Sequence, residues 1–219
     1  LGTWRAGAIY QPLFTAFGPK AVEHRIKESG AKMVVTDAAN SEKLDAIEAA
    51  PRRLVVGDEA GDFWSRVNQQ PSNFEPVLLD GEAPFLAMFT SGTTGPAKQL
   101  HVPLKAIVAF VTYMRDAVDL QPEDNFWNIA DPGWAYGLYY AVTGPLAMGH
   151  STLFYEGGFT VDSTCRVVNE YKITNMAGSP TAFRLLLAAR HEVEGKIKGQ
   201  LRAVSSAGEP LTPEVIRWF

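Results

Sequence analysis

The chain has 219 residues, of which 46% are hydrophobic and 20% charged, a balance typical of a soluble globular protein. Its 20 Lys and Arg against 24 Asp and Glu give a formal net charge of −4 without a basic run, which argues against a nucleic-acid-binding protein. The single cysteine, Cys165, excludes an internal disulfide framework and a cysteine-based zinc site. We expect a cytoplasmic protein, and the sequence leaves its oligomeric state open.

Short apolar runs alternate with stretches of helical periodicity along the chain. Strands are predicted over residues 32–36, 53–56, 85–89, 126–130, 151–155 and 201–205. Helices are predicted between Pro19 and Gly30, over residues 41–50, 62–69, 105–118, 161–171 and 181–193, and from Thr212 onward. Gly30 is expected to end its helix as a C-terminal cap and Thr212 to begin one as an N-cap.

The segment 132–155 carries no charged residue and is long enough to cross a bilayer. It also contains several glycines, Pro145 and His150, and its hydrophobicity is patchy. We therefore expect a loop followed by a buried helix, and no membrane span.

This alternation of strands and helices predicts an α/β fold with mainly parallel sheets flanked by helices. The loop-forming residues between Asp80 and Pro84 suggest a boundary there. We expect a first α/β subdomain over residues 1–82 and a second over residues 83–219.

A dense cluster of polar residues follows the apolar strand 85–89. It reads Thr90, Ser91, Gly92, Thr93, Thr94, Gly95, Pro96, Ala97 and Lys98. Glycines let the backbone approach a phosphate closely, hydroxyls and turn N–H groups donate hydrogen bonds, and Lys98 adds a positive charge. If the strand belongs to a parallel sheet, the loop lies at the edge where ligands bind in open α/β folds. The composition therefore suits a polyphosphate.

Two other interpretations of this loop must be weighed. The Walker A pattern does not fit, because Gly95 is followed by Pro96 and Lys98 by Gln99. A flexible surface loop rich in Ser, Thr and Gly would have the same composition. The residues by themselves leave this second interpretation open.

The order from Thr90 to Gly95, followed by a lysine, resembles the phosphate loop of the adenylate-forming superfamily. This superfamily includes acyl-CoA synthetases, peptide-synthetase adenylation domains and luciferases. The usual succession of Pro, Lys and Gly is replaced here by Pro96-Ala97-Lys98-Gln99. The hydroxyls and the lysine are kept, whereas the loss of the last glycine puts the closure of the loop in question.

Three further segments resemble acetyl-CoA and medium-chain acyl-CoA synthetases. Residues 1–37 resemble the region ahead of the loop, residues 131–137 with 144–146 the Asp-x-Gly-Trp segment, and residues 206–211 the Gly-Glu-Pro turn. The resemblance covers the whole chain in order. It implies part of the large N-terminal domain of an adenylate-forming enzyme.

The resemblance also implies roles for individual residues, with ATP, Mg²⁺ and coenzyme A as cofactors or co-substrates and a small carboxylic acid as substrate. The ATP-binding residues implied are Thr90, Ser91, Gly92, Thr93, Thr94, Gly95 and Lys98 in the loop and Gly208, Glu209 and Pro210 at the adenine. The residues implied for the wall of the acyl pocket are Trp134, Ala135, Tyr136 and Gly137. A plain helix-entry turn remains the alternative for Gly208 to Pro210, and Tyr139 and Tyr140 are expected to be core aromatics.

The reaction implied is activation of a carboxylic acid as acyl-AMP, followed by transfer to coenzyme A. An adenylation domain that loads a carrier protein and a non-catalytic nucleotide-binding or scaffold module are the alternatives. The family's Tyr-Gly-x-Thr-Glu and Thr-Gly-Asp segments and its catalytic-lysine domain do not occur in the chain. We therefore expect a fragment with little activity of its own, in which no catalytic residue and no metal ligand is assigned.

Overall fold

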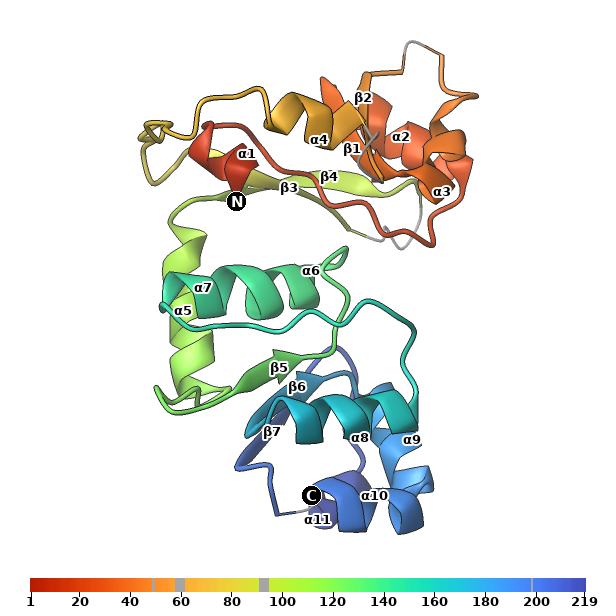
Figure 1. Ribbon diagram of the computed structural model, residues 1–219, viewed down its shortest axis with the longest axis vertical. Helices are drawn as coiled ribbons and strands as arrows, with labels where there is room; N and C mark the ends of the chain where they lie inside the picture. The colour runs from red at the N-terminus through yellow and green to blue at the C-terminus, as the bar shows by residue number, and fades with distance from the viewer. Residues whose placement is uncertain (49, 58–61, 91–94, 198) are drawn as a thin grey trace. The chain divides into compact units, whose positions relative to one another are not determined.

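The computed structural model describes residues 1–48, 50–57, 62–90, 95–197 and 199–219. Within it the chain forms two compact units, Leu1–Leu104 and Lys105–Phe219, whose elements are labelled in Figure 1. The predicted α/β class is confirmed: parallel strands pair in both units, and helices flank them.

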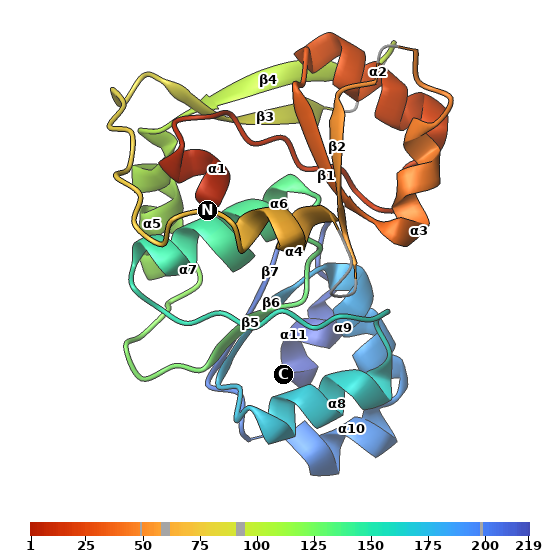
Figure 2. The ribbon, with the colours of Figure 1, turned by 45° about the horizontal axis from the view of Figure 1, so that its top comes forward.

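The first unit holds a parallel strand pair and an antiparallel hairpin. Its strands are β1 (Met33–Asp37), β2 (Arg52–Val56), β3 (Pro84–Thr90) and β4 (Lys98–Pro103). Its helices are α1 (Gly2–Arg5), α2 (Pro19–Ser29), α3 (Ala38–Ser41), the 3₁₀ turn η1 (Glu42–Leu44) and α4 (Asp62–Val67). Figure 2 shows β1 and β2 side by side in their parallel pairing.

Helix α2 is bounded as the sequence predicts. Pro19 occupies the first helical turn, where its missing N–H costs nothing, and Gly30 ends the helix in the left-handed conformation at φ 62°. Val22 and Ile26 lie four residues apart on one face and are buried against Leu44 and Ile47. This packing fixes α2 on its unit.

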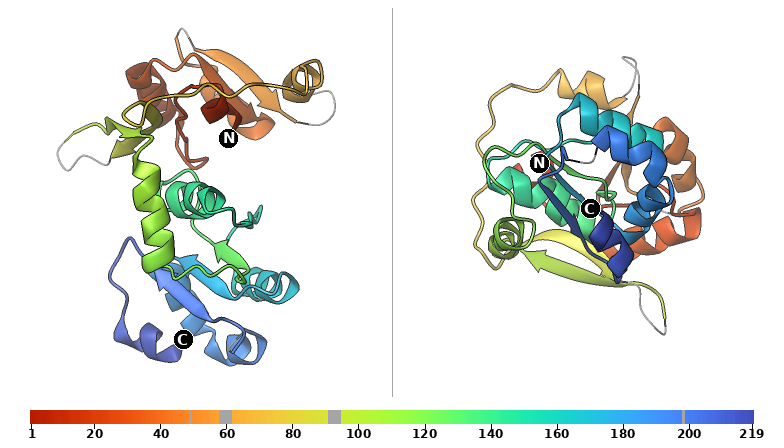
Figure 3. Two further views of the ribbon diagram at one scale, coloured as in Figure 1. Left: turned by 90° about the vertical axis from the view of Figure 1, so that its left-hand side faces the viewer. Right: turned by 90° about the horizontal axis from the view of Figure 1, so that it is seen from below.

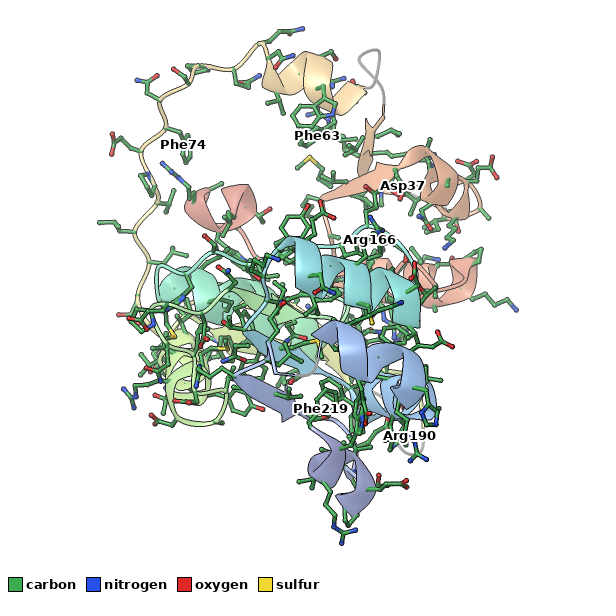
Figure 4. The ribbon with its side chains drawn as sticks, turned by 60° about the horizontal axis from the view of Figure 1, so that its bottom comes forward. Asp37, Phe63, Phe74, Arg166, Arg190 and Phe219 are labelled. Carbon is green, nitrogen blue, oxygen red and sulfur yellow. The ribbon has the colours of Figure 1, made fainter. Side chains whose placement is uncertain are left out.

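The helix predicted over 41–50 begins earlier than expected and is shorter. The Asp37 carboxylate, labelled in Figure 4, accepts a hydrogen bond from the Asn40 backbone N–H at 2.8 Å. It thereby caps α3, which begins at Ala38 and ends at Ser41. The end of β1 therefore leads directly into the helix.

Strand β3 lies between β4 and the segment around Tyr10. The Tyr10 N–H donates to the Phe85 carbonyl at 3.0 Å, and the Ala87 N–H donates to the Tyr10 carbonyl at 2.9 Å. The hairpin thus belongs with the N-terminal residues. The compact unit consequently ends after Leu104, whereas the sequence placed the boundary at residues 82/83.

The second unit is built on a three-stranded parallel sheet in the order β5-β6-β7. Its strands are β5 (Phe126–Asn128), β6 (Asn175–Gly178) and β7 (Ala203–Ser206). Its helices are α5 (Ala106–Asp116), α6 (Ala135–Gly137), the π-helix η2 (Leu138–Thr143), α7 (Gly144–Ala147), α8 (Val161–Glu170), α9 (Pro180–Ala188), α10 (Arg190–Ile197) and α11 (Pro213–Trp218).

Successive residues of these short strands serve opposite faces of the sheet. Phe126 and Ala177 are buried against the side of α5, with Met114 at the centre of that cluster. Trp127 and Met176 are buried in a larger cluster on the other face, which α8 to α11 cover. The sheet therefore has helices on both faces, as is usual for a parallel sheet.

The uncharged segment forms a loop and then a partly buried helix, as predicted. Helix α6, η2 and α7 follow one another from Ala135 to Ala147, and α7 packs beside α5 (Figure 3). Pro145 has no N–H for the Ala141 carbonyl, which instead accepts from the Thr152 hydroxyl at 2.7 Å. No described helix is long and apolar enough to span a bilayer.

Two other element predictions for this unit were wrong. Residues 151–155 form no strand, and a pocket of about 400 Å³ lined by Phe126, Leu153 and Val167 lies beside this segment. The helix predicted over 181–193 is two helices, because the backbone of Ala189 leaves the helical conformation at ψ 22°.

An ion-pair cluster joins the amino ends of the sheet strands. The Arg202 guanidinium pairs with the carboxylates of Asp119 at 2.7 Å and Asp124 at 2.5 Å. The Asp124 side chain is only 3% exposed and also accepts from the Thr174 hydroxyl at 2.7 Å. Burial by itself would raise the pKa of Asp124, but Arg202 and the hydrogen-bond donors outweigh it and hold that pKa well below its usual range.

Replacing Arg202 by Met should destabilise the second unit by about 2–3 kcal/mol at pH 7, because Asp124 would remain buried without its counter-ion. In the unmodified chain, the depressed pKa of Asp124 stabilises the fold above the unfolded-state pKa of about 3.9, and this stabilisation is lost progressively as the pH falls below that value toward the folded-state pKa. Urea unfolding between pH 7 and pH 3 measures both effects.

The matched control is Arg115→Met, which removes an exposed ion pair with Asp116 on α5. This variant should unfold almost like the unmodified chain. Equal stability of Arg202→Met and Arg115→Met would contradict the role given to the cluster.

Candidate functional site

The loop predicted to bind phosphate connects the two strands of the β3–β4 hairpin. Thr90 ends β3, Lys98 begins β4, and the two residues face each other in the antiparallel register. The Thr90 hydroxyl donates to the Lys98 carbonyl at 3.5 Å. The loop therefore leaves and re-enters antiparallel strands, so the condition that its strand belongs to a parallel sheet is not met.

The structure describes only part of this loop. Ser91, Gly92, Thr93 and Thr94 lie outside the described residues. Gly95 is exposed, and a Cβ added to it would meet no atom of the described residues within 4 Å.

Gln99 stands where the resembling family has glycine, and the structure accommodates it in a regular strand. It pairs with Phe89 in the register of the hairpin. Its side-chain amide nitrogen lies 3.0 Å from Nε2 of His101, two residues further on the same face of β4. With Gln99 at this position, β4 begins at Lys98 and pairs regularly with β3 at this end of the hairpin.

In the second unit, the parallel pairing of β6 with β7 brings two turns to one edge. Gly178 and Ser206 are paired at the carboxyl ends of these strands, and the Ser206 hydroxyl donates to the Gly178 carbonyl at 3.0 Å. Residues 179–181 follow the first strand, and residues 208–210 follow the second. This is the edge at which open α/β sheets bind ligands.

The turn after β7 is held by its acidic residue. The Glu209 carboxylate accepts from Arg184 Nη2 at 2.7 Å and from the Thr181 hydroxyl at 3.0 Å. Arg184 first and Thr181 second lower the pKa of Glu209, so this carboxylate stays ionised. Gly208 has φ 98°, a conformation that favours glycine, and Pro210 follows.

Arg184 was not identified from the sequence as part of this site. It lies on α9, one helical turn after Thr181, and that spacing places both side chains on the same helix face. Helix periodicity could therefore have paired Arg184 with Thr181. Only the tertiary structure pairs either of them with Glu209, which is 25 residues from Arg184 in the chain.

The segment predicted to line the acyl pocket follows β5, at the same carboxyl edge of the sheet. Trp134 precedes α6, and Ala135 begins it. A Cβ on Gly137 would lie 2.1 Å from the Asp131 carbonyl oxygen, so the backbone approach there allows only glycine. The segment is thus folded back closely on the end of β5.

Tyr136 is the member of this segment with the most unusual surroundings. Its hydroxyl is buried close to those of Ser205 and Tyr113, without a hydrogen bond of good geometry to any described residue. Burial raises the pKa of the Tyr136 phenol above its usual range, so the group stays protonated. A buried hydroxyl of this kind remains available as a donor to a polar group that enters beside it.

Tyr139 and Tyr140 pack as the sequence predicts for core aromatics. Tyr139 stacks on Phe110 with ring centroids 4.4 Å apart, and Tyr140 stacks on Tyr113 at 4.1 Å. Both partners lie on α5, so these tyrosines fix η2 against that helix.

Comparisons with known proteins agree over the whole chain. The family model described as "AMP-binding enzyme" matches residues 1–219. The chain belongs to the AMP-binding enzyme family. The resemblance to adenylate-forming enzymes inferred from the motifs is therefore confirmed.

Within this family, acetyl-coenzyme A synthetases are similar in sequence. The one from Bacillus subtilis is 36% identical over 228 residues, which cover 100% of this chain and 40% of the relative. The one from Salmonella typhimurium is 30% identical over 245 residues, covering 98% and 38%. The chain thus spans about two fifths of the length of these relatives.

Solved structures of the family share the fold. An acyl-CoA synthetase from Brucella canis is 55% identical with a TM-score of 0.95, covering 100% of this chain and 41% of the neighbour. MatB from Rhodopseudomonas palustris, solved with ATP bound, is 25% identical with a TM-score of 0.82, covering 99% and 43%.

Among the residues described here, no three of His, Cys, Asp and Glu are grouped so that they could hold a metal ion.

Replacing Arg184 by Met should raise the pKa of Glu209 toward its ordinary value, because the neighbouring positive charge is removed. A titration of the Glu209 side-chain carboxyl by NMR measures this shift. The control is Arg190→Met in α10, which should leave the Glu209 titration unchanged. An unchanged Glu209 pKa in Arg184→Met would show that the ion pair does not exist in solution.

Proposed function

We propose that the chain is the nucleotide-binding part of an ATP-dependent acyl-CoA synthetase, an AMP-forming acid–thiol ligase. One observation carries the proposal: a single family match covers all 219 residues, including the hairpin loop and the turn after β7. The similarity to acyl-CoA and acetyl-CoA synthetases supports the choice of reaction within the family.

In this proposal the hairpin loop holds the β- and γ-phosphates of ATP. Thr90 and Lys98 form its base, where the exposed Lys98 would contribute a positive charge. Ser91, Gly92, Thr93, Thr94 and Gly95 would contribute hydroxyl and backbone N–H donors. Such donors stabilise the negative charge that develops on pyrophosphate as it leaves.

The turn of Gly208, Glu209 and Pro210 is proposed to contact the adenine. The left-handed conformation of Gly208 allows a flat base to approach the backbone closely. Glu209 is engaged with Arg184 and Thr181, so we assign it to the shape of the turn and not to the chemical step. Its fixed position keeps the turn open before the base arrives.

The acyl pocket is proposed to form at Trp134, Ala135, Tyr136 and Gly137. The large rings of Trp134 and Tyr136 would cover the apolar part of a carboxylic acid. The buried Tyr136 hydroxyl would in addition donate to a polar atom of the substrate, because it makes no hydrogen bond of good geometry to a described residue.

The proposed reaction has two steps. An oxygen of the substrate carboxylate attacks the α-phosphorus, the bond to the bridging oxygen breaks, and pyrophosphate leaves with that electron pair. The thiolate of coenzyme A then attacks the acyl carbon and displaces AMP. Mg²⁺ would enter as the counter-ion of ATP, where it reduces the charge of the phosphates.

Two other functions remain open to experiment. An adenylation domain would pass the acyl group to a carrier protein, and acyl transfer to coenzyme A or to a carrier protein by a longer protein that carries this chain would separate the two. A non-catalytic nucleotide-binding module would bind ATP without any acid dependence.

Lys98→Ala should weaken binding of Mg-ATP to the 219-residue chain roughly 10- to 100-fold, as expected for the loss of a charge-assisted contact to phosphate. Isothermal titration calorimetry measures the change. Lys20→Ala, at an exposed position of α2, is the matched control and should bind like the unmodified chain. Equal affinities of the two variants for Mg-ATP would contradict the proposed role of Lys98.

The 219-residue chain contains no Tyr-Gly-x-Thr-Glu or Thr-Gly-Asp segment, so we expect it to bind ATP with little or no turnover. Exchange of labelled pyrophosphate into ATP, measured with a panel of short and medium-chain acids, tests this. Exchange at a rate typical of complete enzymes of this class would overturn the expectation.

A further inference from the structure

His24 on α2 contacts the base of the hairpin loop across a long stretch of chain. Its Nε2 donates to the carbonyl oxygen of Ala97 at 2.8 Å, and the two residues are 73 positions apart. Its ring is half-buried and packs edge to face against Phe89, near the end of β3, with the ring centroids 6.1 Å apart. One side chain of α2 thus contacts both a residue of β3 and the residue just before β4.

The Ala97 carbonyl belongs to the same rigid peptide unit as the Lys98 N–H. A hydrogen bond that holds this carbonyl therefore sets the direction of the Lys98 N–H and limits the rotation of the chain before Lys98. On the other side, the Lys98 carbonyl accepts from the Thr90 hydroxyl. The backbone of Lys98 is thus held on both sides.

Helix α2 is itself anchored in the core of the first unit and against the hairpin. Val22 and Ile26 are buried in the core of the first unit. The guanidinium of Arg25, the next residue, lies 4.1 Å from the ring centre of Phe17 and 5.4 Å from that of Phe89. Two consecutive residues of α2 therefore attach it to the hairpin.

We propose that His24 is a positioning residue that orients Lys98 toward the β- and γ-phosphates of ATP. The inference rests on the proposed function of the loop and adds a residue of α2 to it. His24 acts only through the Ala97–Lys98 peptide, so its loss weakens binding of the terminal phosphates. Binding of AMP, which lacks those phosphates, does not depend on it.

A purely stabilising role for His24 makes a different prediction. Loss of the hydrogen bond would then lower the melting temperature of the chain and reduce the fraction that binds. It would not change the ratio of the dissociation constants for ATP and AMP, because both are measured on the folded fraction. This ratio is therefore the decisive quantity.

The test uses two replacements of His24 in the 219-residue chain. His24→Phe keeps an aromatic edge against Phe89 and removes the N–H donor. His24→Gln keeps an N–H donor at a similar reach. His191→Phe, at an exposed position of α10, is the matched control. Calorimetric titrations with Mg-ATP and with AMP give both dissociation constants for each variant.

We expect His24→Phe to raise the dissociation constant for Mg-ATP about five-fold, the usual effect of one hydrogen bond, without changing that for AMP. His24→Gln and His191→Phe should stay close to the unmodified chain. An unchanged ratio in His24→Phe, or an equal loss in His24→Gln, would overturn the role of His24. Failure of the unmodified chain to bind Mg-ATP would instead contradict the proposed function itself.

Discussion

The parallel pairing of β5, β6 and β7 places chemically different residues at the two ends of one small sheet. At the amino ends, Arg202, just before β7, pairs with Asp119 and Asp124, which precede β5. At the carboxyl ends, the chain leaves the sheet in the segments that the proposed function assigns to adenine and acid. A slip of one residue in this register would turn each buried side chain to the wrong face.

The turns at the carboxyl edge are held by contacts within the chain itself. Glu209 is fixed by Arg184 and Thr181, and the backbone at Gly137 is pressed against the end of β5. A site prepared in this way does not have to order its own turns when a ligand binds, which lowers the cost of binding.

Local patterns predicted elements well where short-range physics decides them. Gly30 ends α2 because glycine adopts the left-handed conformation at little cost, and Thr212 precedes α11 because Pro213 favours the first helical turn. The prediction of elements failed where contacts with distant segments decide the local conformation. Residues 151–155 have the composition of a strand but make no ladder, and nothing local at Ala189 marks the break between α9 and α10.

The sequence by itself determined the α/β class, the family and the residues proposed to bind ATP and the acid, because apolar periodicity and motif order are properties of short segments. The tertiary structure decided that Thr90 and Lys98 close an antiparallel hairpin, and it brought His24 to Ala97. Strand partners and contacts across 73 residues depend on how complete segments pack, so spacing along the chain does not reveal them.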